Sequence, residues 1–297
     1  MWPPAADPII AEIKQQIARG EAPWFRGAAD QLVGALWRGT APLWAEEYGT
    51  ARWLTGTVTG PRDALALIVT GGGALATLEQ LPPPIRKRFT GFGFADGLPT
   101  IAVIQSFAHA LRWLEPSAGA REAVASLVRS IHPIESAGPG YDCSHSDPAL
   151  PFSIFVSVPL GERDEALRLA ESILHEAMHL QLSLIERHSP IVGEETSQGY
   201  SPWQRRHRPI LGLVHGLYVF ARILHWLAML SDDGRLDAGD RNYIDRRRIE
   251  IAREIEQIAE LPTSSALTSF GRELSAWLIT RSMADAGLNS GAVAASR

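Results

Sequence analysis

The sequence predicts a mainly helical protein with a small central β-sheet, in the α+β class. Apolar residues recur with helical spacing over most of the chain that follows Pro159. Two earlier segments, residues 125–136 and 152–159, are instead rich in β-branched and aromatic residues, which favour strands. We expect an N-terminal, mainly helical region over residues 1–120, packed as one domain with a second region over residues 121–297.

Three helices and one ambiguous segment are expected in the N-terminal region. Helical spacing predicts helices over residues 9–19, 28–43 and 101–114, and Pro116 ends the last of them. The apolar run ALALIVT at residues 64–70 fits either a short strand or a buried helical turn, because periodicity does not separate the two in so short a run. Three glycines and, further on, three prolines break the pattern after it.

The second region begins with the two predicted strands and continues with helices. The segment AGPGYDCSHSDPALP, which separates the strands, is rich in turn residues and predicts a loop. Apolar spacing then predicts four helices, over residues 162–187, 208–230, 240–260 and 264–286. The final residues, GLNSGAVAASR, are typical of a frayed end.

Composition and charge exclude several classes of protein. The 297 residues include 28 basic and 33 acidic side chains, a net charge of −5, unlike the basic balance of a dedicated nucleic-acid binder. The single cysteine, Cys143, excludes an intramolecular disulfide and a cysteine-rich zinc module. The opening MWPPAAD lacks the basic segment of a secretory signal, and no uncharged apolar run reaches the ~18 residues of a membrane span. We therefore expect a cytoplasmic protein that binds neither nucleic acid nor membrane.

The residues His175, Glu176 and His179 form an H-E-x-x-H motif. Two histidines four residues apart on a helix point the same way and can share one metal ion. The surrounding helix is apolar almost all round, which predicts that it is buried. Its polar residues form one narrow stripe that other side chains, water or a metal must satisfy. A metal explains a His-Glu-His stripe on a buried helix better than a pair of hydrogen-bonded core histidines does.

A second, almost wholly apolar helix carries His215 on one stripe with Arg208 and Arg222. If the two stripes face each other, His215 is the third metal ligand. Glu194 and Glu195 are the alternatives, because zinc peptidases often take a downstream glutamate. Three protein ligands leave open coordination positions for chemistry.

Two reactions fit such a site. In a zinc hydrolase, Glu176 acts as general base on a metal-bound water. In an iron oxygenase, three ligands leave positions for a cosubstrate and O2, and a bidentate arginine suits the far carboxylate of that cosubstrate. Arg208 and Arg222 favour the oxygenase, because a buried arginine without an anionic partner is costly. Pairing of these arginines with Glu186 or Glu176 is the alternative, and a degenerate scaffold without catalysis is the third hypothesis.

Three segments together resemble a known family. They are SDPALPFSIFVSVP, LHEAMH and SPWQRRHRPILGLVHGLYVF, in this order and within about residues 130–230. The chain resembles the HEXXH-motif putative peptide-modification proteins found beside genes for ribosomal-peptide and other natural-product biosynthesis. Members of this family are described as Fe(II)- and α-ketoglutarate-dependent peptide β-hydroxylases.

The resemblance implies a cofactor, a substrate and roles for particular residues. Fe(II) would be held by His175, His179 and His215, and Arg208 would anchor α-ketoglutarate, which is decarboxylated to succinate as the substrate is hydroxylated. The substrate would be a peptide, such as a ribosomally made precursor. Trp203 and Tyr218 would shape the pocket, with packing as the alternative role.

Ser144, His145 and Ser146 lie next to a predicted strand near the motif helix. All three are candidates for contact with substrate or cosubstrate, with a hydrogen-bonded turn as the alternative. In the competing zinc peptidase, the cofactor would be Zn and Glu176 the base.

Overall fold

The computed structural model describes the motif helix, the sheet and the C-terminal helices. The described residues are 64–69, 75–79, 91, 93–94, 100–128, 130–147, 153–193, 196–234 and 236–287. The helices predicted over residues 9–19 and 28–43 lie outside them. The described residues divide into two compact units, one that ends at Leu184 and one that begins at Ile185.

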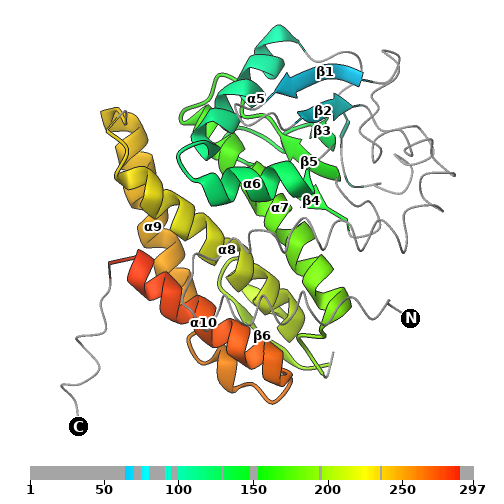
Figure 1. The fold of residues 1–297 in the computed structure, drawn as a ribbon, viewed down its shortest axis with the longest axis vertical. Helices are drawn as coiled ribbons and strands as arrows, with labels where there is room; N and C mark the ends of the chain where they lie inside the picture. Colours follow the sequence, from blue (N-terminus) through cyan, green and yellow to red (C-terminus); the bar gives the residue numbers. More distant parts are fainter. Residues whose placement is uncertain are drawn as a thin grey trace, which may run out of the picture. The chain divides into compact units, whose positions relative to one another are not determined.

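Unit 1 contains a five-stranded sheet and helices (Figure 1). Its elements in chain order are β1 (Ala64–Val69), β2 (Leu75–Glu79), α5 (Ile101–Leu114), α6 (Ala118–Leu127), β3 (Ser130–Ile134), β4 (Ser144–Ser146), β5 (Ser153–Ser157) and most of α7 (Glu165–His188). The strand order is β1-β2-β3-β5-β4. Strands β2, β3 and β5 are parallel, whereas β1 and β4 run antiparallel to their neighbours. This order places β4 at one edge of the sheet.

The structure confirms some predictions for unit 1 and corrects others. The segment 152–159 contains β5, whose five residues are all buried, and the ambiguous run at 64–70 is strand β1. The strand predicted over residues 125–136 is wrong in its first part, because α6 extends to Leu127. The side chain of Ser117 accepts the amide of Ala120 and so starts this helix. The two missed strands are β2 and β4.

The chain enters α7 through a tight turn. Asp164 has a φ of 57°, and its carbonyl accepts the amide of Arg168 in the first helical turn. The helix then buries apolar side chains on nearly every side, among them Ile173, Leu174 and Met178, each 0% exposed. A helix with so little polar surface must be packed on all sides, as the sequence predicts.

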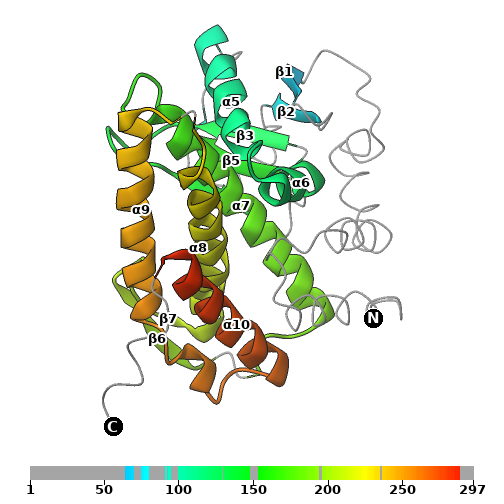
Figure 2. The same ribbon diagram turned by 60° about the vertical axis from the view of Figure 1, so that its left-hand side comes forward.

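Unit 2 is helical and carries one hairpin. Its elements are the end of α7, β6 (Gln198–Ser201), β7 (Arg206–Pro209), α8 (Ile210–Ser231), α9 (Ala238–Glu256), the 3-10 turn η1 (Leu261–Thr263) and α10 (Ser269–Asp285). Helices α8, α9 and α10 pack side by side (Figure 2). The four helices predicted over residues 162–187, 208–230, 240–260 and 264–286 are therefore confirmed as α7 to α10, whereas the hairpin was not predicted.

Side-chain caps set the ends of the C-terminal helices. Asp237 and Asp240 form a capping box that starts α9, and Thr268 caps α10 by accepting the amide of Gly271. These caps explain why α9 begins before, and α10 after, the predicted residue.

Helix α8 supplies the core of unit 2. Most of its side chains are buried, including Val214, Leu217 and Trp226, each 0% exposed. By length and composition α8 is also the helix, among those that the structure describes, that could cross a membrane. However, 72% of the apolar 18-residue stretch of α8 is buried inside the structure, and a core helix has the same length and composition.

Candidate functional site

The H-E-x-x-H histidines lie one turn apart on α7, and their rings converge. His175 Nε2 and His179 Nε2 are 3.1 Å apart, with the ring centroids 4.8 Å apart. Two nitrogens at about 2.0–2.1 Å from one ion lie about 2.9 Å apart at a right angle and about 3.4 Å apart in a tetrahedron. The observed spacing falls between these values and is also that of a hydrogen bond. Both histidines are part-exposed, so an ion or substrate can reach them.

Glu176, between the two histidines, points into the protein and is 3% exposed. Ser144 donates a hydrogen bond of 2.6 Å from Oγ to Oε1 of this glutamate, and the Ser146 hydroxyl also bonds the carboxyl group. Burial raises the pKa of Glu176 to about 7, against the effect of the two serines, which lower it. Its Oε1 lies 3.9 Å from His175 Nε2. The motif glutamate is thus a buried carboxyl group that titrates near neutral pH.

The edge strand β4 supplies the partners of Glu176. Because alternate residues of a strand point to opposite faces, Ser144 and Ser146 share one face and His145 lies on the other. His145 is 6.1 Å from the ring of Phe155 on β5, and burial lowers its pKa. Ser144, a predicted substrate contact, therefore holds the motif glutamate, and His145 packs against the sheet.

In unit 2, His215 is paired with a carboxylate. Its Nε2 lies 3.0 Å from Oε2 of Glu186, in the last turn of α7. Both side chains are about one-fifth exposed, at 18% and 20%. Of the alternative ligands, Glu194 and Glu195 lie outside the described residues. Among the residues that are described, no group of three or more His, Cys, Asp and Glu side chains could hold a metal ion.

The two predicted anion-binding arginines have different surroundings. Arg208 lies on β7 and is half-buried, and its guanidinium packs over Gly212, where a Cβ would be 3.4 Å from Nε. Within the described part of the chain, the Arg208 guanidinium makes no hydrogen bond or ion pair.

Arg222 is instead a core residue of unit 2, with 0% exposure. Its guanidinium lies 4.6 Å from the ring centroid of Tyr218 and 5.2 Å from that of Trp277. Burial lowers the pKa of Arg222 to about 10 and raises that of Tyr218 to about 12. Of the two arginines, Arg222 is thus enclosed in the core and Arg208 remains partly exposed. The structure favours packing over pocket lining for Tyr218, which is 0% exposed.

Trp203 follows β6 and covers the glycine face of α8. A Cβ on Gly216 would lie 2.4 Å from Cζ3 of Trp203, so only glycine admits the indole there. The ring stacks on Phe220 with centroids 5.1 Å apart. The indole N–H is buried and has no acceptor among the side chains and backbone that the structure describes.

Sequence reasoning missed some partners of the predicted residues. Trp277 was not singled out, Ser146 was expected only as a possible substrate contact, and Glu186 was considered as a partner of the arginines and not of His215. The serine pair has a local signal, since Ser-x-Ser presents two hydroxyls on one face of a strand. The other two are long-range contacts. The chain matches no known protein-family model, and no curated protein matches it.

Proposed function

We propose that this protein is an Fe(II)- and α-ketoglutarate-dependent oxygenase that hydroxylates a β-carbon in a peptide substrate, such as a ribosomally made precursor in natural-product biosynthesis. His175 and His179 hold the iron, and His215 is the third ligand, with Glu194 and Glu195 as alternatives. Iron supplies the activation of O2 when it is bound. Arg208 binds the far carboxylate of α-ketoglutarate.

The observation that carries this proposal is the half-buried Arg208, whose guanidinium has no anionic partner in the described chain. An arginine in such a place is stabilised by an anion, and its planar fork matches a carboxylate. The nitrogen donors of the two motif histidines suit Fe(II), and the chain offers no thiolate cluster that would favour another metal. Glu176 holds α7 to the sheet through Ser144, a role that an oxygenase allows.

Two measurements test the oxygenase. The protein is purified anaerobically, loaded with Fe(II) and supplied with α-ketoglutarate and O2, and succinate is measured. We expect succinate from the wild type and none from His175→Ala or His179→Ala, with iron content lowered in both variants. Unchanged iron content in these variants would refute the metal site, and a loaded wild type that forms no succinate would refute the oxygenase.

A pair of variants on one strand tests the anion site. Arg208→Gln removes the charge over Gly212, whereas Arg206→Gln removes a charge from an exposed side chain that bonds Gln204 on the same hairpin. We expect the KM for α-ketoglutarate to rise about tenfold to a hundredfold in the first variant, because a pair of charged hydrogen bonds to the carboxylate is lost. The second variant should keep the wild-type KM.

One observation favours a zinc-dependent metallopeptidase as the second candidate. Burial raises the pKa of Glu176 to about 7, which is where a general base is most effective at neutral pH. In this case the zinc-loaded protein cleaves peptides, and Glu176→Gln abolishes cleavage while zinc stays bound. Peptide cleavage without succinate formation would decide for this candidate.

A further inference from the structure

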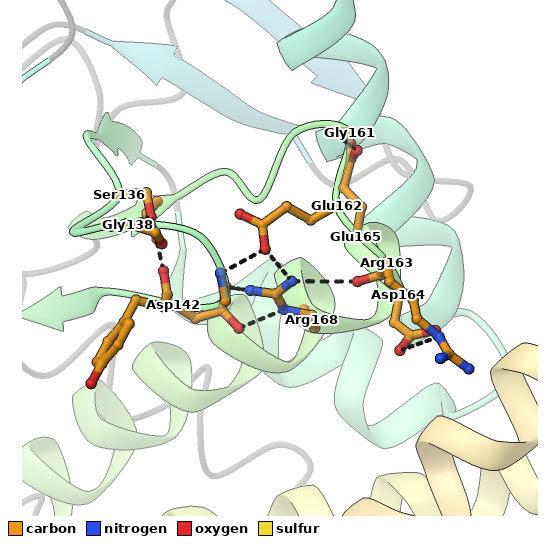
Figure 3. Close-up of polar contacts among 12 residues, drawn as sticks. Ser136, Gly138, Asp142, Gly161, Glu162, Arg163, Asp164, Glu165 and Arg168 are labelled. Carbon is orange, nitrogen blue, oxygen red and sulfur yellow. Dashed lines mark hydrogen bonds and ion pairs between the residues drawn. The ribbon is translucent and has the colours of Figure 1, made fainter.

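Arg168, in the first turns of α7, uses most of its donors in one polar cluster (Figure 3). Its Nε and Nη2 donate to the two carboxylate oxygens of Asp142 at 2.9 and 2.8 Å. Its Nη1 donates to Oε2 of Glu162 at 2.8 Å and to the carbonyl of Arg163 at 3.3 Å. The side chain is only 12% exposed, and the Asp142 hydrogen bonds raise its pKa above the ordinary arginine value. We call Arg168, Asp142 and Glu162 the Arg168 clamp.

The clamp joins three pieces of chain that are separate in sequence. Asp142 ends the turn that precedes β4, and Glu162 lies in the turn that precedes α7. Oε2 of Glu162 also accepts the amide of Gly140 at 2.9 Å. Gly140 has a φ of 76°, a conformation that favours glycine. Both turns are therefore attached to the start of α7 through one guanidinium.

The residue after Asp142 continues this attachment into the sheet. The amide of Cys143 donates to Oγ of Ser157 at 2.8 Å, and the amide of Ser157 donates back to the carbonyl of Cys143 at 2.8 Å. Strand β4 starts at the next residue, Ser144, which is the residue that bonds Glu176. Only one residue separates the clamp from the serine that contacts the motif.

Strand β4 is weakly held by itself. It has three residues, pairs with β5 alone among the described strands and is at the edge of its sheet. Such a strand has few contacts to keep its place, so its position depends on its attachments. The Arg168 clamp and the Ser144–Glu176 hydrogen bond attach it to the same helix at points eight residues apart, about 12 Å along the axis.

We propose that Arg168 is a positioning residue for the H-E-x-x-H motif: the Arg168 clamp fixes β4 against α7, so that Ser144 and Ser146 hold Glu176. Bonding of Glu176 fixes the turn of α7 that carries His175. Groups that orient metal ligands from behind typically change metal affinity by about 10–100-fold when they are removed. The metal in this inference rests on the proposed function, whereas the attachment of β4 does not.

The experiment compares Arg168→Gln with Arg163→Gln in the full chain. Arg163 is a matched control, because it loses the same charge from a side chain that is 71% exposed, five residues away. Amide hydrogen exchange of the 136–147 segment reports on the attachment, and Co(II) titration followed by absorption reports on the motif. Arg168→Gln should speed exchange in this segment at least tenfold and weaken Co(II) binding by about 10–100-fold. Arg163→Gln should change neither.

A double-mutant cycle separates positioning from a general loss of stability. If Arg168 acts through Ser144 and Ser146, adding Arg168→Gln to a variant with both Ser144→Ala and Ser146→Ala should weaken Co(II) binding by less than about threefold more, because the path is already broken. If the combined variant instead weakens Co(II) binding by the full product of the separate factors, Arg168 acts independently of the serines. That result would overturn the inference.

The two proposals fail in different ways. Wild-type protein that binds no Co(II) counts against the metal site, and hydrogen exchange then still decides on the clamp. Exchange in the 136–147 segment that is the same in Arg168→Gln as in the wild type would overturn the inference, whatever the metal result.

Discussion

From the buried carboxyl group of Glu176 we predict how the stability of the protein depends on pH. The group is 3% exposed, and burial raises its pKa from 4.5 to about 7 in the folded protein. Well below pH 4.5 the group is protonated in both the folded and the unfolded state, and it adds no pH dependence. As the pH rises towards 7, the unfolded state ionises first, so the free energy of unfolding falls.

The size of this effect follows from the two pKa values. Each unit of difference corresponds to about 1.4 kcal/mol, so ionisation of Glu176 lowers the free energy of unfolding by about 3 kcal/mol above pH 7. Glu176→Gln removes the charge and keeps an oxygen that can accept the Ser144 hydroxyl. Between pH 4.5 and pH 8, the free energy of unfolding of the variant should therefore fall by about 3 kcal/mol less than that of the wild type.

Urea unfolding of metal-free protein, followed by circular dichroism at several pH values, measures this difference. Glu250→Gln is the control, because Glu250 is 48% exposed and a surface change of this kind alters stability by about 0.5 kcal/mol or less. An equal fall in stability with pH in wild type and Glu176→Gln would show that Glu176 is not a destabilising buried charge.

Three further predictions concern unit 2 and are checked by urea unfolding. Gly216→Ala places a Cβ 2.4 Å from the Trp203 ring and should lower the free energy of unfolding by about 1–3 kcal/mol. In the control Gly234→Ala no atom lies within 4 Å of the added Cβ, so stability should not fall. Equal stabilities of the two variants would contradict this prediction. Arg222→Ala leaves a cavity between two rings and should lower the free energy of unfolding by about 2–4 kcal/mol. Arg222→Met fills this space and should lower it much less. Asp285→Asn weakens the 2.9 Å contact with His225 and should lower the free energy of unfolding by about 1–3 kcal/mol. His225→Ala breaks the same contact and should lower it by a similar amount.

The helices around the candidate site could be read from the sequence, because their period is local. An apolar stripe at every third and fourth position marks α7 to α10, and the H-E-x-x-H spacing alone places His175 and His179 on one side of α7. Strand β5 was also predictable, since a short run rich in β-branched and aromatic residues favours a buried strand.

The surroundings of these residues were decided by the tertiary structure. Arg208 and Arg222 share one predicted stripe, yet packing of α10 against α8 encloses Arg222 between two rings, and Arg208 stays on a hairpin over Gly212. Strand β4 was hidden for a similar reason: three residues in a turn-rich segment carry too little pattern, and pairing with β5 makes them a strand. The sequence by itself thus determined which side chains can do chemistry. Contacts between residues far apart in the chain decided the burial, the pKa and the partners of each, because these depend on neighbours that no local pattern contains.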